Sequence, residues 1–130
     1  MKHWLRRALL VTAALLTIGI ATAIFMRNVG DDPARWHVDP LSAVRTGQPN
    51  DYLIAPAGIM TVHPDSITPV FAADPTTLMA TLDRLIMSEP RTKRIAGRPE
   101  DRFVTYVQRS RIFGFPDYVS VRAFPKMRDL

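Results

Sequence analysis

The sequence contains no cysteine among its 130 residues. This absence excludes disulfide bonds, thiolate metal sites, a cysteine nucleophile and an N-terminal cysteine that carries lipid. Histidine is scarce as well, since His3, His37 and His63 are the three imidazoles, and they are not spaced like ligands on one element. We therefore predict no metal site and no cofactor, because none of the recurring ligand spacings is present.

The usual catalytic motifs are also missing. There is no GxGxxG run, no GxxxxGK[ST] phosphate loop, and no GxSxG context around Ser110. The adjacent acid pairs, Asp31-Asp32 and Glu100-Asp101, lie in predicted turns, where solvated charge is the usual explanation. Glycosidase chemistry needs two carboxylates that face each other across a cleft. The sequence therefore identifies no catalytic residue, and enzymatic activity stays open but is not favoured.

The positive charge is concentrated before residue 8. The chain has a net charge of +5, of which Lys2, Arg6 and Arg7 supply +3, so that +2 remains for the chain after residue 26. A nucleic-acid-binding domain carries its basic excess on its folded part. We therefore predict no nucleic-acid partner.

Residues 8–26 form the long apolar run of this chain, 19 consecutive residues without a charge. As a helix at ~1.5 Å per residue they extend about 28 Å, close to the hydrocarbon thickness of a bilayer. Cations precede the run, whereas Asp31 and Asp32 follow it. The positive-inside rule then places residues 1–7 in the cytoplasm and residues 27–130 on the other side. We predict an integral membrane protein with a single span.

A cleaved signal peptide is the alternative interpretation of this run. The small residues Ala21, Thr22 and Ala23 suit a signal peptidase, and the residues before the run are basic. The apolar run, however, continues for three residues past that site, which favours a retained span. Both interpretations export the rest of the chain.

Residues 27–66 are predicted to be an extended, proline-rich segment. Seven of the 11 prolines lie between residues 27 and 75, and each residue before a proline is biased away from helix. Apolar residues occur here only in short groups. We expect this segment to lie over the following domain and not to form a core of its own.

Residues 67–130 are predicted to form a small α+β domain of one strand, one helix and three antiparallel strands. The first strand is placed at residues 67–71. Asp74 and Pro75 are typical of a helix start, an apolar stripe follows, and Pro90 ends the helix. The stripe consists of Leu78, Met79, Leu82, Leu85 and Ile86.

The last three strands are predicted at residues 92–96, 102–110 and 118–124, with short turns between them. Both sides of the strand at 102–110 carry apolar groups, which is typical of the middle of a sheet. The strand at 118–124 is expected to be an exposed edge. Strands joined by short turns pair antiparallel, and the helix then covers one face of the sheet.

Several motifs together resemble a bacterial family, the domain of unknown function fourteen-ninety-nine. They are Glu-Pro-Arg-Thr at 89–92, Val-Thr-Tyr-Val-Gln-Arg-Ser at 104–110, Gly-Phe-Pro-Asp-Tyr at 114–118 and Asp-Pro-Ala-Arg-Trp-His-Val-Asp-Pro at 32–40. The resemblance covers roughly residues 32–124. It implies a protein of the bacterial inner membrane, with residues 27–130 on the periplasmic or outer side. It supplies no catalytic residues to carry over.

The family's pattern continues with a further strand, a polar turn and a closing helix, whereas this chain ends at Leu130. The resemblance therefore implies that the domain is truncated at its C-terminus, an expectation that concerns residues 126–130.

The segment from Arg109 to Asp117 is a candidate binding site because it concentrates aromatic groups between charged ones. Its aromatic side chains either complete the core under the helix stripe, or they form a contact surface for anionic lipid, a partner protein or a small ligand. In the second case the arginines would hold an anion. The basic run at 91–98 is either a solvated strand end and turn, or a further group that the same anionic surface attracts. The candidate residues are Arg109, Arg111, Phe113, Phe115 and Asp117.

The function predicted from the sequence is therefore a single-pass membrane protein of the bacterial cell envelope with an exported, non-catalytic domain. The alternative is an enzyme or ligand-binding protein that acts on an envelope lipid or wall component. A degenerate fragment without activity of its own is a third reading.

Overall fold

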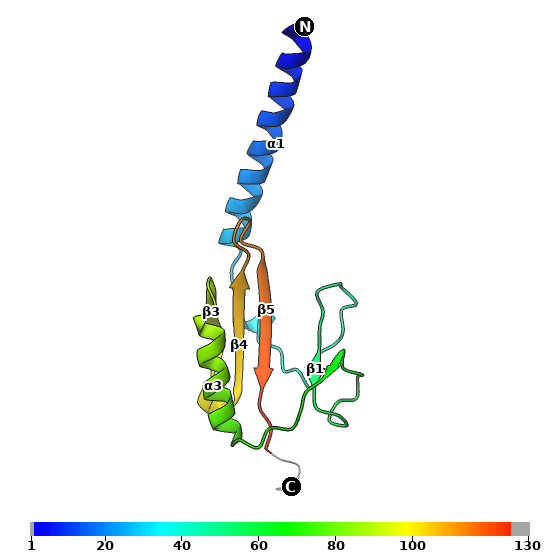
Figure 1. Ribbon diagram of the computed structural model, residues 1–130, viewed down its shortest axis with the longest axis vertical. Helices are drawn as coiled ribbons and strands as arrows, with labels where there is room; N and C mark the ends of the chain where they lie inside the picture. The colour runs from blue at the N-terminus through cyan, green and yellow to red at the C-terminus, as the bar shows by residue number, and fades with distance from the viewer. Residues whose placement is uncertain (1, 126–130) are drawn as a thin grey trace.

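The computed structural model of this protein describes residues 2–125 and has an α+β architecture. A long helix at the N-terminus extends away from a small domain in which one helix packs on a three-stranded sheet (Figure 1). The helices are α1 (Lys2–Asn28), α2 (Pro33–Trp36), α3 (Pro75–Ser88) and the short 3-10 helix η1 (Pro99–Asp101). The strands are β1 (Ile54–Ala55), β2 (Ser66–Ile67), β3 (Thr92–Arg98), β4 (Phe103–Arg109) and β5 (Pro116–Arg122).

Helix α1 is long and apolar enough to cross a membrane, which confirms the predicted helix over residues 8–26. It begins earlier than the apolar run because the basic residues before the run continue the same helix. None of its residues is buried against the rest of the chain. An apolar helix with every face exposed is the pattern expected of a segment that lipid surrounds.

Helix α3 has the predicted bounds to within one residue, and its ends follow from local chemistry. The carboxylate of Asp74 accepts hydrogen bonds from the backbone amides of Thr76 and Thr77, at 3.0 Å each. These amides have no partner inside the helix, so the cap stabilises its first turn. Glu89 precedes a proline and adopts an extended conformation, which ends the helix.

The sheet has the order β3-β4-β5 with antiparallel pairing throughout, so β4 is central, as predicted. Val104 and Tyr106 of β4 point toward α3 and are almost completely buried against Met79. Ile86, Val121 and Ala123 complete this small core.

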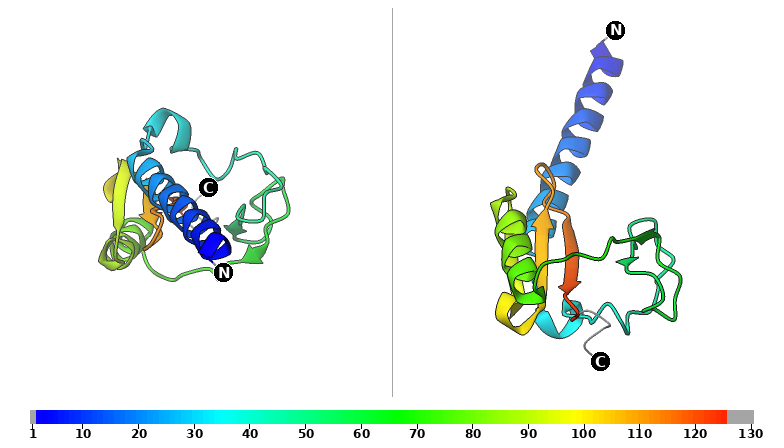
Figure 2. Two further views of the ribbon diagram at one scale, coloured as in Figure 1. Left: turned by 90° about the horizontal axis from the view of Figure 1, so that it is seen from above. Right: turned by 60° about the horizontal axis from the view of Figure 1, so that its bottom comes forward.

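The opposite face of the sheet is covered by the segment of residues 31–39, which includes α2. The ring of Trp36 stacks on Tyr118 of β5, and the ring of His37 stacks on Phe103 of β4, both at 3.9 Å between centroids. Figure 2 shows α2 and α3 on different sides of the sheet when the molecule is seen from above. The expectation that this segment lies over the domain is confirmed for residues 31–39.

Two predictions about residues 41–71 are wrong. The strand predicted at 67–71 is reduced to β2, which pairs in parallel with β1 and does not join the main sheet. Thr68 still donates to the carbonyl of Ala55, but Pro69 after it has no N–H to continue the pairing. The segment also buries two side chains of its own, Leu53 and Ala55, so residues 41–67 form a small separate lobe beside the sheet (Figure 1).

The lobe is held by polar contacts more than by apolar packing. Arg45 contacts the carboxylates of Asp51 and Asp65 at 3.1 and 2.8 Å, and Asp65 also accepts from the backbone amide of Leu53.

The predicted C-terminal truncation concerns residues 126–130, which lie outside the described residues. Within residues 2–125, no strand pairs with the outer side of β5.

The core predicts a difference between two residues of α3. We expect Met79→Ala to lower the free energy of unfolding by ~2–5 kcal/mol, because it empties a fully enclosed site. Leu85→Ala should change it by less than ~0.5 kcal/mol, because Leu85 faces solvent. Urea unfolding of the full chain in neutral detergent, followed by the fluorescence of Trp36 in a Trp4→Phe background, measures both. Equal losses in the two variants would contradict this core.

Candidate functional site

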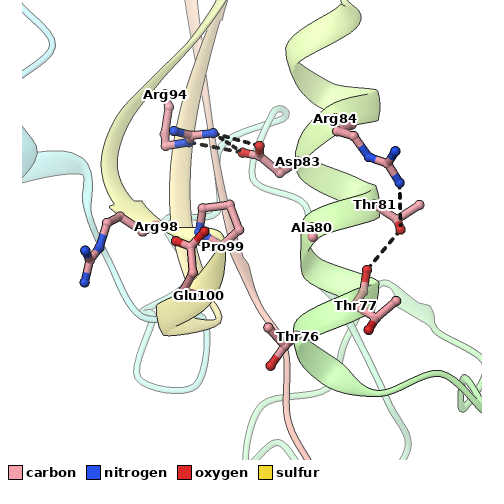
Figure 3. A pocket seen from close by; sticks show the side chains of 10 residues that line it. All are labelled: Thr76, Thr77, Ala80, Thr81, Asp83, Arg84, Arg94, Arg98, Pro99 and Glu100. Carbon is pink, nitrogen blue, oxygen red and sulfur yellow. Dashed lines mark hydrogen bonds and ion pairs between the residues drawn. The ribbon is translucent and has the colours of Figure 1, made fainter.

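Two of the hollows on the surface of the described residues differ in charge. The first, of about 570 Å³, lies between α3 and the β3–η1 connection (Figure 3). The arginines on its β3 side already have carboxylate partners, since Arg94 contacts Asp83 at 2.7 Å and Arg98 contacts Asp101 at 3.0 Å. Glu100 also lines it. Its positive and negative charges therefore largely cancel.

Asp83 in this hollow supports the core. Its carboxylate accepts hydrogen bonds from Arg94 and, at 2.9 Å, from the hydroxyl of the buried Tyr106. Burial by itself would raise the pKa of Asp83, but the hydrogen bonds from Arg94 and Tyr106 outweigh it and hold that pKa below its ordinary value. Burial and the neighbouring Asp83 raise the pKa of Tyr106, which stays protonated and donates. This network joins α3 to the sheet and offers no free acid or base.

The second hollow, of about 490 Å³, lies at the end of α1 and is strongly basic. Five of its lining residues are cationic and none is acidic, so it is the candidate anion site of this protein. We call it the basic pocket. Its lining residues are Arg27, Arg91, Thr92, Lys93, Val107, Arg109, Ser110, Arg111 and Gly114.

Arg109 lies at the junction between α1 and the sheet and joins the two. Its guanidinium donates to the carbonyl oxygens of Met26 and Val29 at 2.7 Å each, and to the carboxylate of Asp31 at 2.6 Å. The last carbonyls of a helix have no partner inside it, and a cation at that end also complements the helix dipole. Arg109 therefore terminates α1 and fixes its end to β4.

Asp31 is the acid of this junction. Its carboxylate contacts Lys93 and Arg109 at 2.6 Å each and accepts from the hydroxyl of Tyr118 at 3.2 Å. Its side chain is only 7% exposed. Burial raises its pKa, but the hydrogen bond from Lys93 and the charges of Arg109 and Lys93 outweigh burial, so that the pKa of Asp31 lies below its ordinary value.

The β4–β5 turn packs directly on the last turn of α1. The guanidinium of Arg27 donates to the carbonyl oxygens of Arg111 and Ile112 at 3.3 and 3.0 Å. Gly114 has a φ of +73°, and a Cβ there would lie 2.4 Å from Cγ of Arg27. A larger residue fits neither the backbone conformation nor the space. Gly114 thus permits the close approach of the turn to the helix.

The structure places the five predicted binding residues in different situations. Arg109 belongs to the junction, and its guanidinium is occupied there, so its predicted role as the residue that holds an external anion is not supported. Arg111 is exposed and lines the basic pocket. Asp117 is an exposed residue of β5, opposite Gln108, and lines neither hollow.

The two phenylalanines do not complete the core, so the first interpretation of this segment is wrong. Phe113 and Phe115 are 39% and 43% exposed, and their rings pack on each other at 5.6 Å between centroids. The turn that carries them lies at the α1 end of the sheet (Figure 1), whereas the core lies between α3 and the sheet. They flank Gly114, which lines the basic pocket, in the same turn.

Sequence reasoning did not identify Asp31 or Arg27 as site residues, and it included Lys93 only as part of the basic run at 91–98. The contacts of Asp31 join residues that are far apart in the chain, and no local sequence pattern predicts them. The division of the basic run at 91–98 was foreseeable, because neighbouring residues of a strand face opposite sides. Lys93 accordingly lines the basic pocket and Arg94 the other hollow.

His37 is the one imidazole with a contact to the sheet among the described residues. Its Nδ1 lies 2.8 Å from Oγ1 of Thr105, which in turn lies 2.8 Å from Oγ of Ser120. Thr105 is completely buried, so this chain of hydrogen bonds attaches the covering segment to the sheet and presents no nucleophile to solvent. Residues 2–125 contain no group of three or more side chains placed to hold a metal ion.

No family model matches this chain, and the searches of curated proteins and of solved structures also found no match. The likeness to the bacterial family described above therefore stays a prediction.

The lowered pKa of Asp31 predicts acid sensitivity. A carboxyl with a depressed pKa in the folded state contributes stability above its unfolded pKa of about 3.9, and that contribution is lost as the pH falls through the folded pKa. We expect Asp31→Asn to lower the unfolding midpoint at neutral pH. Below about pH 4, the midpoint of this variant should depend less steeply on pH than that of the wild type. The control is Asp32→Asn, an adjacent change of equal charge at an exposed helix cap that asparagine also fills. Identical pH profiles for both variants would contradict the assignment.

The exposure of the two phenylalanines predicts small effects on stability. Phe113→Ala and Phe115→Ala should each cost well under the ~3–5 kcal/mol of a buried phenylalanine. Urea unfolding in detergent measures this, with Met79→Ala as the buried reference. A loss of that size in both variants would restore them to the core.

Proposed function

We propose that this chain is a single-pass protein of the bacterial cell envelope whose α1 spans the inner membrane, with the N-terminus in the cytoplasm. Its α+β domain lies on the periplasmic or outer side and is non-catalytic. The domain is held directly against the membrane surface, without a free linker between the span and the folded part.

The observation that carries this proposal is the junction around Arg109. A helix that is only a targeting signal needs no structural link to the domain that it exports. Here Arg109 of β4 donates to the carbonyls of Met26, in the last turn of α1, and of Val29, directly after it, and the β4–β5 turn contacts Arg27. Cleavage after Ala23 would leave the short apolar stub of residues 24–26 exposed in water at this junction. Retention of the helix avoids that exposure.

The bacterial location is supported by the family likeness predicted from the sequence. The motifs that carry it correspond to structural parts of the fold: residues 104–110 form most of β4 and its end, residues 114–118 include the end of the turn and the start of β5, and most of residues 32–40 cover the sheet. The alternative function is a ligand-binding protein or enzyme for an envelope lipid or wall component. The basic pocket is the observation that favours ligand binding within that alternative.

Topology is the direct test. A reporter that is active only outside the cytoplasm should be active when fused after Leu130 and inactive when fused to the N-terminus, because the cations before residue 8 stay inside. Intact protein should remain with the membrane after a carbonate wash. The mature mass should include residues 1–23 of the chain.

A matched variant separates the orientation signal from the helix itself. Changing Lys2, Arg6 and Arg7 to glutamine should weaken or scramble the orientation while α1 keeps its length. Mature protein that begins at Ile24, or that is released by the carbonate wash, would overturn the proposal.

A further inference from the structure

If α1 spans the membrane, the position of the basic pocket relative to the lipid layers is defined. The inference below rests on that part of the proposed function. The last turn of α1 contains Arg27, which lines the pocket and follows the apolar run directly. A span of this length ends at the boundary between the hydrocarbon and the headgroups. The pocket therefore opens at the depth of the lipid phosphates.

Three of the cations in the pocket have no carboxylate partner within residues 2–125, and one of them, Arg27, already donates to the carbonyl oxygens of Arg111 and Ile112. Arg109 and Lys93 share Asp31. Arg91 donates to the carbonyl of Arg109 and has no carboxylate partner within residues 2–125, and the same part of the chain supplies no hydrogen-bond acceptor to the side chain of Arg111. Arginine binds phosphate oxygens in a bidentate manner, so this pair is suited to a phosphate group.

The backbone near the pocket carries further signs of a specialised site. Arg91 adopts a left-handed conformation, with φ of +60°, which is uncommon for a residue other than glycine and clusters at functional positions. Thr92 also lines the pocket, and its hydroxyl oxygen is buried with no partner in the described part of the chain. Buried polar atoms are nearly always hydrogen-bonded. The hydroxyl of Thr92 can therefore form a further hydrogen bond at the wall of the pocket.

Exposed apolar side chains lie on the β4–β5 turn, two residues of which, Arg111 and Gly114, line the pocket. Ile112 is 70% exposed, and the pair of Phe113 and Phe115 adjoins it. A free phosphate ion or an acidic peptide gives no reason for such groups beside an anion site. A phospholipid does, since its acyl chains begin within a few ångströms of its phosphate, where interfacial side chains reside.

We propose that the basic pocket binds the phosphate of an anionic phospholipid from the bilayer that α1 spans. Arg91 and Arg111 hold the phosphate, and Ile112 and Phe113 contact the glycerol and the upper acyl chain. Arg109 and Asp31 do not touch the lipid and act as positioning residues that shape the pocket.

Native mass spectrometry of the full chain in a neutral detergent tests this directly. Phosphatidylglycerol and phosphatidylcholine with identical acyl chains are titrated separately, and inorganic phosphate is added in a third arm. We expect the wild-type chain to retain phosphatidylglycerol in preference to phosphatidylcholine. The double variant Arg91→Gln with Arg111→Gln should weaken phosphatidylglycerol binding by at least about tenfold, because it removes two charge-assisted contacts.

The matched control is Arg84→Gln with Arg102→Gln, which removes the same charge from exposed positions outside the pocket. It should bind like the wild type. Trp36 fluorescence in urea checks that both double variants are folded. If the pocket variant is not folded, Arg111→Gln alone replaces it, because the described residues use only the backbone of Arg111 in hydrogen bonds.

Three results would overturn the proposal: no preference between the two lipids, an equal loss in both double variants, or complete displacement of the lipid by inorganic phosphate, which would make the pocket a site for free phosphate. The measurement is made in detergent and does not depend on orientation in a membrane. A failure here with correct topology removes the lipid site alone. Release of α1 by cleavage removes the proposed function whatever the pocket binds in detergent.

Discussion

The carboxylate of Asp31 is the point at which the long helix, the sheet and the segment that covers it are joined. It accepts from Lys93 of β3, Arg109 of β4 and Tyr118 of β5, so one side chain contacts all three strands. Removing one partner of a buried ion pair costs on the order of 3–5 kcal/mol, because the other charge is left without compensation. The contacts of Asp31 thus fix the end of α1 relative to all three strands of the sheet.

The covering segment follows from the same constraint. A three-stranded sheet with one helix leaves its second face open, and a chain of this size has little apolar surface with which to close it. The segment after Asp31 closes that face by stacking Trp36 and His37 on strand residues and by bonding His37 to a buried threonine. Arg122 and Asp39 form an ion pair at the far end of the face. The two layers around the sheet thus differ in chemistry: one is mainly apolar, the other aromatic and polar.

Much of the fold was predictable because local chemistry decides it. Asp74, Pro75 and Pro90 set the ends of α3, and the two-sided apolar character of residues 102–110 indicated the central strand. The failures occurred where tertiary contacts decide. Residues 67–71 have the composition of a strand, but β2 takes its partner from the lobe, and Pro69 prevents extension. Residue type alone could not decide whether the phenylalanines of the turn belong to the core or to a contact surface, and it is the packing of Gly114 on Arg27 that holds their turn at the end of α1.

The candidate site was predictable only in part, for a related reason. The sequence indicated a group of charged and aromatic residues near Arg109, and Arg111 does line the basic pocket. The acid that determines the role of Arg109 lies 78 residues earlier in the chain. A pattern within one segment cannot distinguish an arginine that binds an external anion from one that is already paired. Contacts of this separation are a property of the fold.

The absence of a linker between α1 and the sheet limits where the domain can operate. Strand β4 has seven residues and rises about 3.3 Å per residue, so the sheet extends roughly 23 Å from the end of the helix. The strands run nearly in line with α1 (Figure 1), and the edge of β5 therefore faces sideways. In a chain that spans a bilayer, that edge stays within this distance of the membrane surface and faces neighbours beside the protein. Rotation of α1 about its axis would turn the β5 edge toward a different neighbour.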